Sequence, residues 1–274
     1  MADVAFISNE LEILLYSIYA VATFTQLYIG LYLFSKFKQN SLKYLQYLSF
    51  SFLFLSFSFI CSILRTLFPG TLWEIIFILS KEILQLFGVF MLMFFANHVF
   101  HQKNQKGYSL LKTSLIISGI FVCVSAILRF YYFPDLIFYL YQAANSYDIA
   151  MPGLYMGYYS IKEHSKLKGK LIETWILKRY LMAGIASLIF AFQFLPTLAF
   201  SKEGISRANL NIWEVAAIVI LAITIMLYSF FAFIAWVMPS FVKNNIKQKQ
   251  QLPNIENFSE EDFEGIKNNN NNKM

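Results

Sequence analysis

Lys81, Glu82 and Gln85 lie well inside a mainly apolar run between residues 73 and 96. A charged side chain in the hydrocarbon core of a membrane costs about 3 kcal/mol or more, so such groups face protein or water and usually have a function. A carboxyl group there either pairs with a cation or takes up a proton. These residue types therefore predict ligand binding or proton coupling on a membrane-spanning helix.

A second polar set lies in the apolar run 136–159. Gln142, Asn145 and Asp148 recur every three residues, which places them on one side of a helix. At 1.5 Å per residue both sets lie roughly 9–18 Å from the outer ends of their helices, and Gln193 is expected near that depth. We therefore predict an outward-facing polar pocket between the third, fifth, sixth and seventh helices. Its ligand-binding or coupling residues are Lys81, Glu82, Gln85, Gln142, Asn145, Asp148 and Gln193.

Prolines near these residues are candidates for hinges. Pro152, followed by Gly153, removes a backbone hydrogen bond from the fifth helix, and Pro196 does the same in the sixth. The charged residues themselves allow two interpretations. Lys81, Glu82 and Asp148 either form a buried ion pair that only fixes helix packing, or they line a site for a ligand, an ion or a proton.

The elements that position these residues follow from composition. Hydrophobic residues make up 58% of the chain, aromatic residues 19% and charged residues only 14%, which is typical of an integral membrane protein. A spanning helix needs about 20 apolar residues. Seven such runs are present, at 11–34, 47–68, 73–96, 111–132, 136–159, 180–200 and 213–238. We predict an all-α, seven-helix transmembrane domain over residues 1–240 and a disordered cytoplasmic tail over residues 241–274.

Basic residues indicate the orientation. They are frequent after the first, third, fifth and seventh runs, whereas the opposite ends carry only Arg65, Arg129, Lys202 and Arg207. Because positive charge resists translocation, the lysine-rich side is expected to be cytoplasmic, with the N-terminus outside and the C-terminus inside. No nucleic-acid partner is expected. The net charge of +6 suits anionic lipid headgroups better than nucleic acid. Glu74 and Glu214 are expected at the outer interface, in the first turns of their helices.

Short matches between the two halves suggest an internal repeat. Residues 27–32 match residues 154–159, residues 72–75 match 212–215, and Thr66-Leu67 matches Thr197-Leu198, all in the same order. They predict two parallel three-helix units joined by the fourth helix. When Trp73 is aligned with Trp213, the polar residues of run 73–96 have no counterpart in run 213–238, as expected of a specialised site.

This architecture resembles several membrane protein families. The seven-helix arrangement with an outer N-terminus is similar to G-protein-coupled receptors and prokaryotic seven-helix sensor modules. The 3+1+3 pattern resembles microbial rhodopsins and transporters of the SWEET and PQ-loop type. Run 213–238 contains no lysine, so a retinal Schiff base is excluded there, and no other cofactor is expected. Pro-Gln pairs are missing, and Ala96-Asn97-His98 stands where receptors carry Asp/Glu-Arg-Tyr.

The sequence therefore favours a multi-pass receptor or sensor, placed in the cell membrane, that binds a small ligand and signals to a separate cytoplasmic partner through residues 162–179, from Lys162 to Arg179. The alternative is a small-solute or proton-coupled transporter with Glu82 or Asp148 as its coupling carboxylate. His98, His101 and His164 lie on one side and raise a third hypothesis, an intramembrane metallohydrolase. Because the inner half of the bundle supplies no carboxylate beside them, neither a metal site nor an enzyme is expected.

Overall fold

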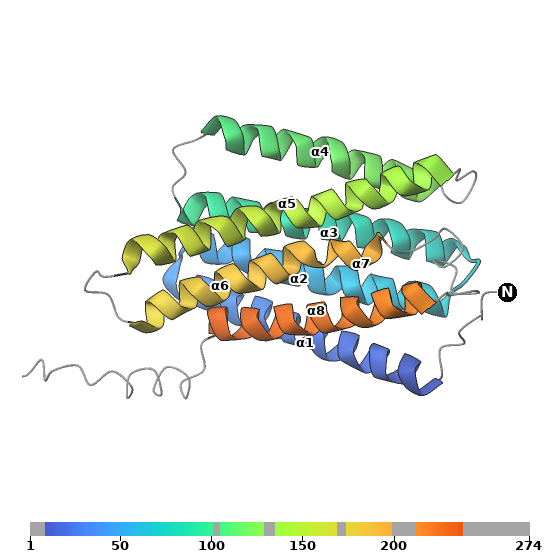
Figure 1. The fold of residues 1–274 in the computed structure, drawn as a ribbon, viewed down its shortest axis with the longest axis horizontal. Coiled ribbons are helices and arrows are strands. Elements are labelled where there is room, and N and C mark those ends of the chain that lie inside the picture. The colour runs from blue at the N-terminus through green and yellow to red at the C-terminus, as the bar shows by residue number, and fades with distance from the viewer. Residues whose placement is uncertain (1–8, 101–104, 129–134, 169–173, 199–211, 238–274) are drawn as a thin grey trace, which may run out of the picture.

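The computed structural model of the chain describes residues 9–100, 105–128, 135–168, 174–198 and 212–237. These residues form seven long α-helices and two short helical turns (Figure 1). The long helices are α1 (Asn9–Asn40), α2 (Lys43–Leu64), α3 (Leu72–Val99), α4 (Gln105–Leu128), α5 (Asp135–Leu167), α6 (Thr174–Phe192) and α8 (Ile212–Val237). The turns are η1 (Arg65–Leu67) and α7 (Phe194–Thr197). The prediction of an all-helical, seven-helix fold is confirmed.

Six of the long helices are apolar and long enough to cross a membrane: α1 from Tyr16 onward, α2, α3, α4 from Gly107 onward, α6 and α8. The chain is therefore a multi-pass integral membrane protein by length and composition. The α5 helix is not among the six, although it has 33 residues. Its polar residues Gln142, Ser146 and Asp148 are buried inside the bundle, so composition alone understates how well α5 suits a membrane.

Several helices extend beyond the predicted runs at the lysine-rich end. The α1 helix continues to Asn40, α5 continues to Leu167, and α6 already begins at Thr174. Hydropathy marks the part of a helix that lies in lipid, whereas backbone hydrogen bonding continues into the polar turns beyond it. Most of the predicted 162–179 loop is therefore helical, and residues 169–173 lie outside the described residues, as does the predicted tail.

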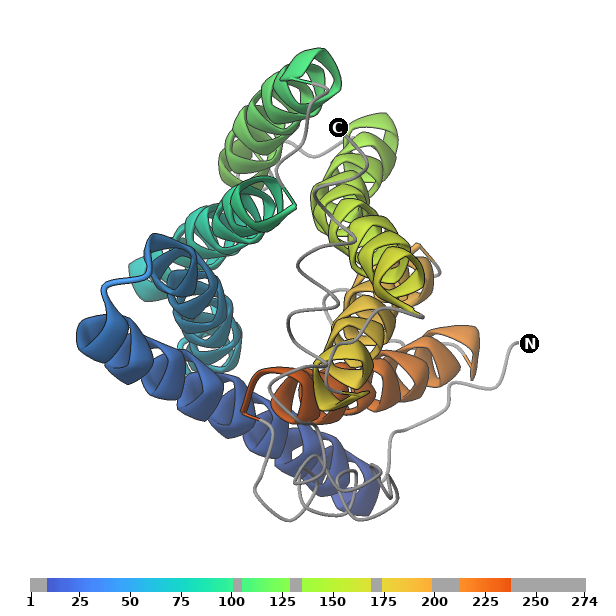
Figure 2. The ribbon, with the colours of Figure 1, turned by 90° about the vertical axis from the view of Figure 1, so that its left-hand side faces the viewer.

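The helices pack in a ring that follows their order in the chain (Figure 2). Each long helix contacts the next, α8 returns to α1, and α3 also contacts α5. The α4 helix packs against α3 and α5. Figure 2 shows α1, α2 and α3 along one side of the ring and α5, α6 and α8 along the other, with α4 at one corner. Residues of α3 and α5 that are distant in sequence are therefore neighbours.

Aromatic side chains fill the core toward the lysine-rich end. The ring of Phe95 on α3 meets that of Trp236 on α8 edge to face, with centroids 5.3 Å apart. Arg179 on α6 donates to the backbone oxygens of Ala235 and Trp236, over 2.6 and 3.0 Å, and lies over the Trp236 ring. A cation at that place satisfies carbonyls that the helix end leaves without donors. Arg179 thus fixes the end of α8.

The α5 and α6 helices approach closely through small residues. A Cβ atom on Gly153 would lie 2.8 Å from the Ser187 carbonyl oxygen and 2.9 Å from the Ala191 nitrogen, and one on Gly157 would lie 2.8 Å from Leu188 Cδ2. Small residues four apart allow this kind of close helix contact in membranes. The helix α5 stays helical through Pro152, and Gly153 serves the contact with α6.

The sixth predicted helix is interrupted near its end. The α6 helix stops at Phe192, and Pro196 lies in the separate turn α7. A proline has no N–H to donate to the carbonyl four residues earlier, which here belongs to Phe192. The break at Gln193 follows from that missing bond.

Candidate polar site between α3, α4 and α5

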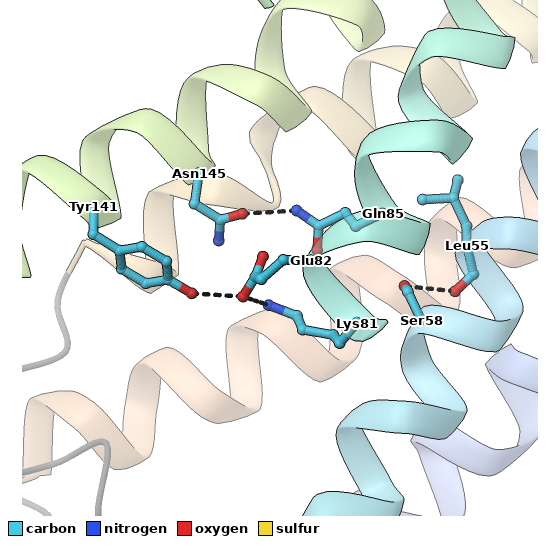
Figure 3. Close-up of polar contacts among 7 residues, drawn as sticks. All are labelled: Leu55, Ser58, Lys81, Glu82, Gln85, Tyr141 and Asn145. Atoms are coloured by element: carbon cyan, nitrogen blue, oxygen red, sulfur yellow. Dashed lines mark hydrogen bonds and ion pairs between the residues drawn. The ribbon is translucent and has the colours of Figure 1, made fainter. Parts of the chain in front are cut away.

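The centre of the candidate site is the carboxyl group of Glu82 on α3. Glu82 is 3% exposed, and its Oε1 accepts hydrogen bonds from Lys81 Nζ at 2.9 Å and from the Tyr141 hydroxyl at 2.6 Å (Figure 3). Because Tyr141 belongs to α5, this carboxyl joins two helices. Both donors stabilise a negative charge on Glu82.

A second polar contact lies one helical turn further along α3. Gln85 Nε2 donates to Asn145 Oδ1 on α5 over 2.7 Å (Figure 3). Gln85 follows Glu82 by three residues and Asn145 follows Tyr141 by four, so each pair lies on one face of its helix. Two polar contacts therefore follow one another along the α3–α5 interface.

The second buried carboxyl, Asp148 on α5, lies beside this interface and is also 3% exposed. It is close enough to Glu82 for the two carboxyls to interact electrostatically, and it hydrogen-bonds with Ser118 on α4. Ser118 Oγ in turn donates to the Ala144 carbonyl oxygen over 3.2 Å. The half-buried thiol of Cys123 on α4 interacts electrostatically with both carboxyls. The site thus includes α4 as well as α3 and α5.

Some atoms of the site have no partner among the described residues. Glu82 Oε2 and Asp148 Oδ1 are buried and lack a hydrogen-bond donor. A buried acceptor left without a donor costs about 1–3 kcal/mol, and groups of this kind in native proteins call for an explanation such as a bound water, ion or ligand. Two carboxyl oxygens at the same site therefore lack a hydrogen-bond donor among the described residues.

Pro152 adds a further acceptor. In a regular helix the N–H of residue 152 would donate to the carbonyl of Asp148, and proline has none to give. The backbone and the side chain of Asp148 therefore both present oxygens that regular helix bonds leave open.

The structure brings together most of the predicted residues. Lys81, Glu82, Gln85, Asn145 and Asp148 belong to the cluster, and Gln142 is buried on α5 beside Tyr141. Gln193 is buried at the α6–α7 junction, where its Nε2 lacks a partner among the described residues. No described contact links Gln193 to Glu82 or Asp148. The described polar contacts of the cluster come from α3, α4 and α5. The predicted lining of the pocket by the sixth and seventh helices is supported by no described polar contact.

Two residues of the site were missed by the sequence reasoning. Tyr141 precedes the predicted stripe by one residue, and the spacing of 141, 145 and 148 is a better helix face than the three-residue spacing of 142, 145 and 148. Ser118 lies in a run of apolar residues, and only the packing of α4 on α5 identifies it.

Other polar groups are buried elsewhere in the bundle. Glu214 lies in the first turn of α8, as predicted, and is fully buried there. Glu74, its counterpart in the proposed repeat, accepts from the Gly70 N–H over 2.8 Å at the start of α3. Gln26 on α1 donates to Ser229 on α8 over 3.2 Å. The Gln26–Ser229 bond joins α1 to α8 and involves no residue of the cluster around Glu82.

The histidines do not form a cluster in the part of the chain that the structure describes. His98 is exposed and lies beside the rings of Tyr44 and Tyr47 on α2, while His101 falls outside that part. Within the same residues no group of three or more His, Cys, Asp or Glu side chains is arranged to hold a metal ion. The hydrolase hypothesis gains no support from this arrangement.

Comparison with known proteins finds no family, no curated protein and no solved structure that matches this chain. The polar site between α3, α4 and α5 is therefore the feature that indicates a function.

Proposed function

We propose that the chain is a seven-helix membrane receptor or sensor that binds a small ligand at the Glu82–Asp148 site. The observation that carries this proposal is the pair of buried carboxyl oxygens, Glu82 Oε2 and Asp148 Oδ1, that lack donors among the described residues. A ligand with hydrogen-bond donors would fill both positions. An ion pair that only fixes helix packing would not require two buried oxygens without donors.

The residues present favour a ligand with a cationic or strongly donating group. Two carboxyls and one lysine leave the cluster with an excess of negative charge when both carboxyls are ionised, and a bound amine would balance it. Gln85 and Asn145 are bonded to each other, and either amide can turn toward a polar group of the ligand. Small polar amines are therefore the compounds to test first.

The orientation proposed from the lysine distribution places this site in the outer half of the membrane. Under that orientation the ligand enters from outside, and the lysine-rich ends of α5 and α6 face the cytoplasm. Lys162, Lys166 and Lys178 are exposed there, whereas Arg179 is directed toward α8. A cytoplasmic signalling partner would contact the exposed lysines.

The second candidate function is a proton-coupled transporter, and the Ser118 contacts favour it. Ser118 has a single hydroxyl proton and two acceptors, the Asp148 carboxyl and the Ala144 carbonyl. A protonated Asp148 would satisfy all three groups by donating to Ser118 Oγ while Ser118 donates to Ala144. Loss of that proton would break the chain of bonds beside Pro152, the predicted hinge of α5.

A binding screen combined with an uptake assay tests both functions. Purified protein is screened by thermal shift against small amines, amino acids and sugars, and every stabilising compound is then assayed for uptake into proteoliposomes with and without a pH gradient. A receptor should be stabilised by its ligand and show no uptake. Uptake that depends on the gradient would establish the transporter instead.

Three variants make the test specific. Glu82→Gln and Asp148→Asn should each abolish the thermal shift, because they remove the charge and keep the shape. Glu163→Gln, at the lysine-rich end where Glu163 pairs with Lys166, should leave the shift unchanged. A ligand that stabilises Glu82→Gln and Asp148→Asn as well as the wild type would overturn the assignment of the site.

A further inference from the structure

A pocket of about 320 Å³ lies between α4 and α5, apart from the Glu82 site. Its lining consists of four tyrosines with small or apolar residues between them. They are Gly107, Tyr108, Leu110, Leu111 and Ser114 on α4, and Tyr147, Met151, Tyr155 and Tyr159 on α5. No function proposed above uses these residues.

The lining forms two matching stripes. On α5 the residues recur every four positions from 147 to 159, and on α4 they recur every three or four from 107 to 114, so each stripe lies on one helix face. The α5 stripe extends over about 18 Å of helix. Gly107 and Tyr159 lie toward the lysine-rich end, and Leu110, at the rim, is 74% exposed. The pocket therefore extends along both helices and is open at the exposed residue Leu110.

Polarity is unevenly distributed along the pocket. At its far end Ser114 and Tyr147 are hydrogen-bonded over 2.6 Å. Ser114 also donates to the Leu111 carbonyl oxygen, so Tyr147 must be the donor between the two hydroxyls. Leu111 and Met151 line the middle. The two hydroxyl groups at the far end are thus already hydrogen-bonded to protein. An apolar ligand fits between them and the mouth.

The charges in and beside the pocket limit the kind of ligand that it can bind. None of the lining residues is charged, and Lys162 Nζ lies 5.7 Å from the centre of the Tyr159 ring beside the mouth. A cationic headgroup would be repelled by Lys162, and an anionic group inside the pocket would find no cation. A neutral amphiphile with one small polar group suits this arrangement.

Sequence patterns on both helices agree with one class of neutral amphiphile. Sterol-contact patterns combine a branched aliphatic residue, a tyrosine and a basic residue, in either order. The sequence of α5 carries Leu154, Tyr159 and Lys162, and that of α4 carries the reverse order Lys106, Tyr108 and Leu110. Of these residues, Tyr159, Tyr108 and Leu110 line the pocket. Such patterns are common on their own. Here both tyrosines line the same pocket, which the patterns alone do not require.

We propose that the α4–α5 pocket binds a sterol from the lysine-rich leaflet. The sterol hydroxyl lies between the hydroxyls of Tyr108 and Tyr159 at the mouth, and the fused rings run past Tyr155 toward Leu111 and Met151. Flat rings against tyrosine faces bury apolar area without needing any polar partner. The site is independent of the Glu82–Asp148 cluster, although Tyr147 directly precedes Asp148 on α5.

Photolabelling tests this proposal. The full chain is reconstituted in phosphatidylcholine nanodiscs with a photoreactive cholesterol analogue, and labelled residues are mapped by mass spectrometry. We expect saturable labelling of α4 and α5 residues of the pocket and at least a fivefold loss with excess cholesterol. Labelling that rises linearly with the analogue or maps to other helices would overturn the proposal.

Matched variants localise the site. Leu110→Trp should fill the mouth and lower labelling at least fivefold, while Ile117→Trp, seven residues along the same face and 65% exposed, should change it less than twofold. Both positions face outward, so both variants should keep the thermal unfolding temperature of the wild type. Equal labelling of the two variants would refute the pocket. Competition by anionic phospholipid in place of cholesterol would also refute it and would identify a phospholipid site.

Discussion

Glu82 receives both of its described hydrogen bonds on one oxygen, and this makes its pairing sensitive to a change in either donor. Lys81→Met would leave a buried carboxyl with Tyr141 as its one described donor. Breaking a buried ion pair costs about 3–5 kcal/mol, but the Lys81 side chain is 21% exposed, so we expect about 1–3 kcal/mol. Thermal unfolding in one detergent would measure this loss.

A double-mutant cycle separates the pair from its surroundings. Glu82→Gln combined with Lys81→Met should be more stable than the sum of the single losses, with a coupling of about 1 kcal/mol or more. Lys162→Met, which removes a lysine at the exposed end of α5, serves as the control for loss of positive charge. Strict additivity of the Lys81 and Glu82 effects would show that the pair does not stabilise the fold.

The charged residues of the site could be predicted from the sequence, whereas Tyr141 could not. The residues Lys81, Glu82 and Asp148 could be predicted because charge is rare inside apolar runs. Tyr141 could not, since a tyrosine in such a run is equally at home against lipid, and only the packing of α5 on α3 directs its hydroxyl at Glu82. Glu214 was predicted in the first turn of its helix and lies there, but its complete burial could not be predicted because it depends on the packing of the neighbouring helices.

The α5–α6 contact depends on the absence of a side chain at Gly153. Its added Cβ would meet the backbone of Ser187 and Ala191, which cannot move alone, whereas a Cβ on Gly157 would meet the flexible Leu188 side chain. We therefore expect Gly153→Ala to destabilise by about 1–3 kcal/mol and Gly157→Ala to cost clearly less. Thermal unfolding of the two variants side by side measures the difference. Equal effects would contradict the backbone contact.

Arg179 joins α6 to the end of α8 by two hydrogen bonds to carbonyls. Arg179→Met keeps much of the apolar stem and removes both donors, and bonds from charged donors contribute about 1.5–3 kcal/mol each. The variant should loosen the end of α8, measured as faster hydrogen exchange in residues 230–237. Lys178→Met, at the exposed neighbouring position, should leave that exchange unchanged. Unchanged exchange in Arg179→Met would mean that other contacts hold the helix end.

Helix positions were predictable from hydropathy, and helix ends were not. Each of the seven apolar runs contains a long helix, because a buried apolar segment in lipid must satisfy its own backbone hydrogen bonds. At the lysine-rich end the helices α1, α5 and α6 include turns whose lysines lowered the hydropathy. At the other end the Pro196 ring and the turn at Arg65–Leu67 end regular helix earlier than the apolar run does.

Two glycines that match in the predicted repeat each pack against a leucine of the next helix. Gly30 on α1 faces Leu53 on the following helix, and Gly157 on α5 faces Leu188 on the following helix. These glycines occupy the same place in the matching segments 27–32 and 154–159. The duplication into two units joined by α4 stays a prediction.

Whether α5 crosses the membrane decides the topology of the whole molecule. With seven crossings, Gln39 after α1 and Lys166 near the end of α5 lie on the same side, and Leu72 at the start of α3 lies on the other. With α5 left uncrossed, Lys166 would share the side of Leu72. All three residues are exposed. Single cysteines at these positions can therefore be labelled by a membrane-impermeant maleimide in intact cells, once Cys61 and Cys123 have been replaced by alanine.

We expect Leu72→Cys to react at once, and Gln39→Cys and Lys166→Cys only after permeabilisation. Reaction of Lys166→Cys together with Leu72→Cys would reduce the bundle to six crossings, and a reversed pattern at all three positions would place the Glu82 site in the inner half of the membrane.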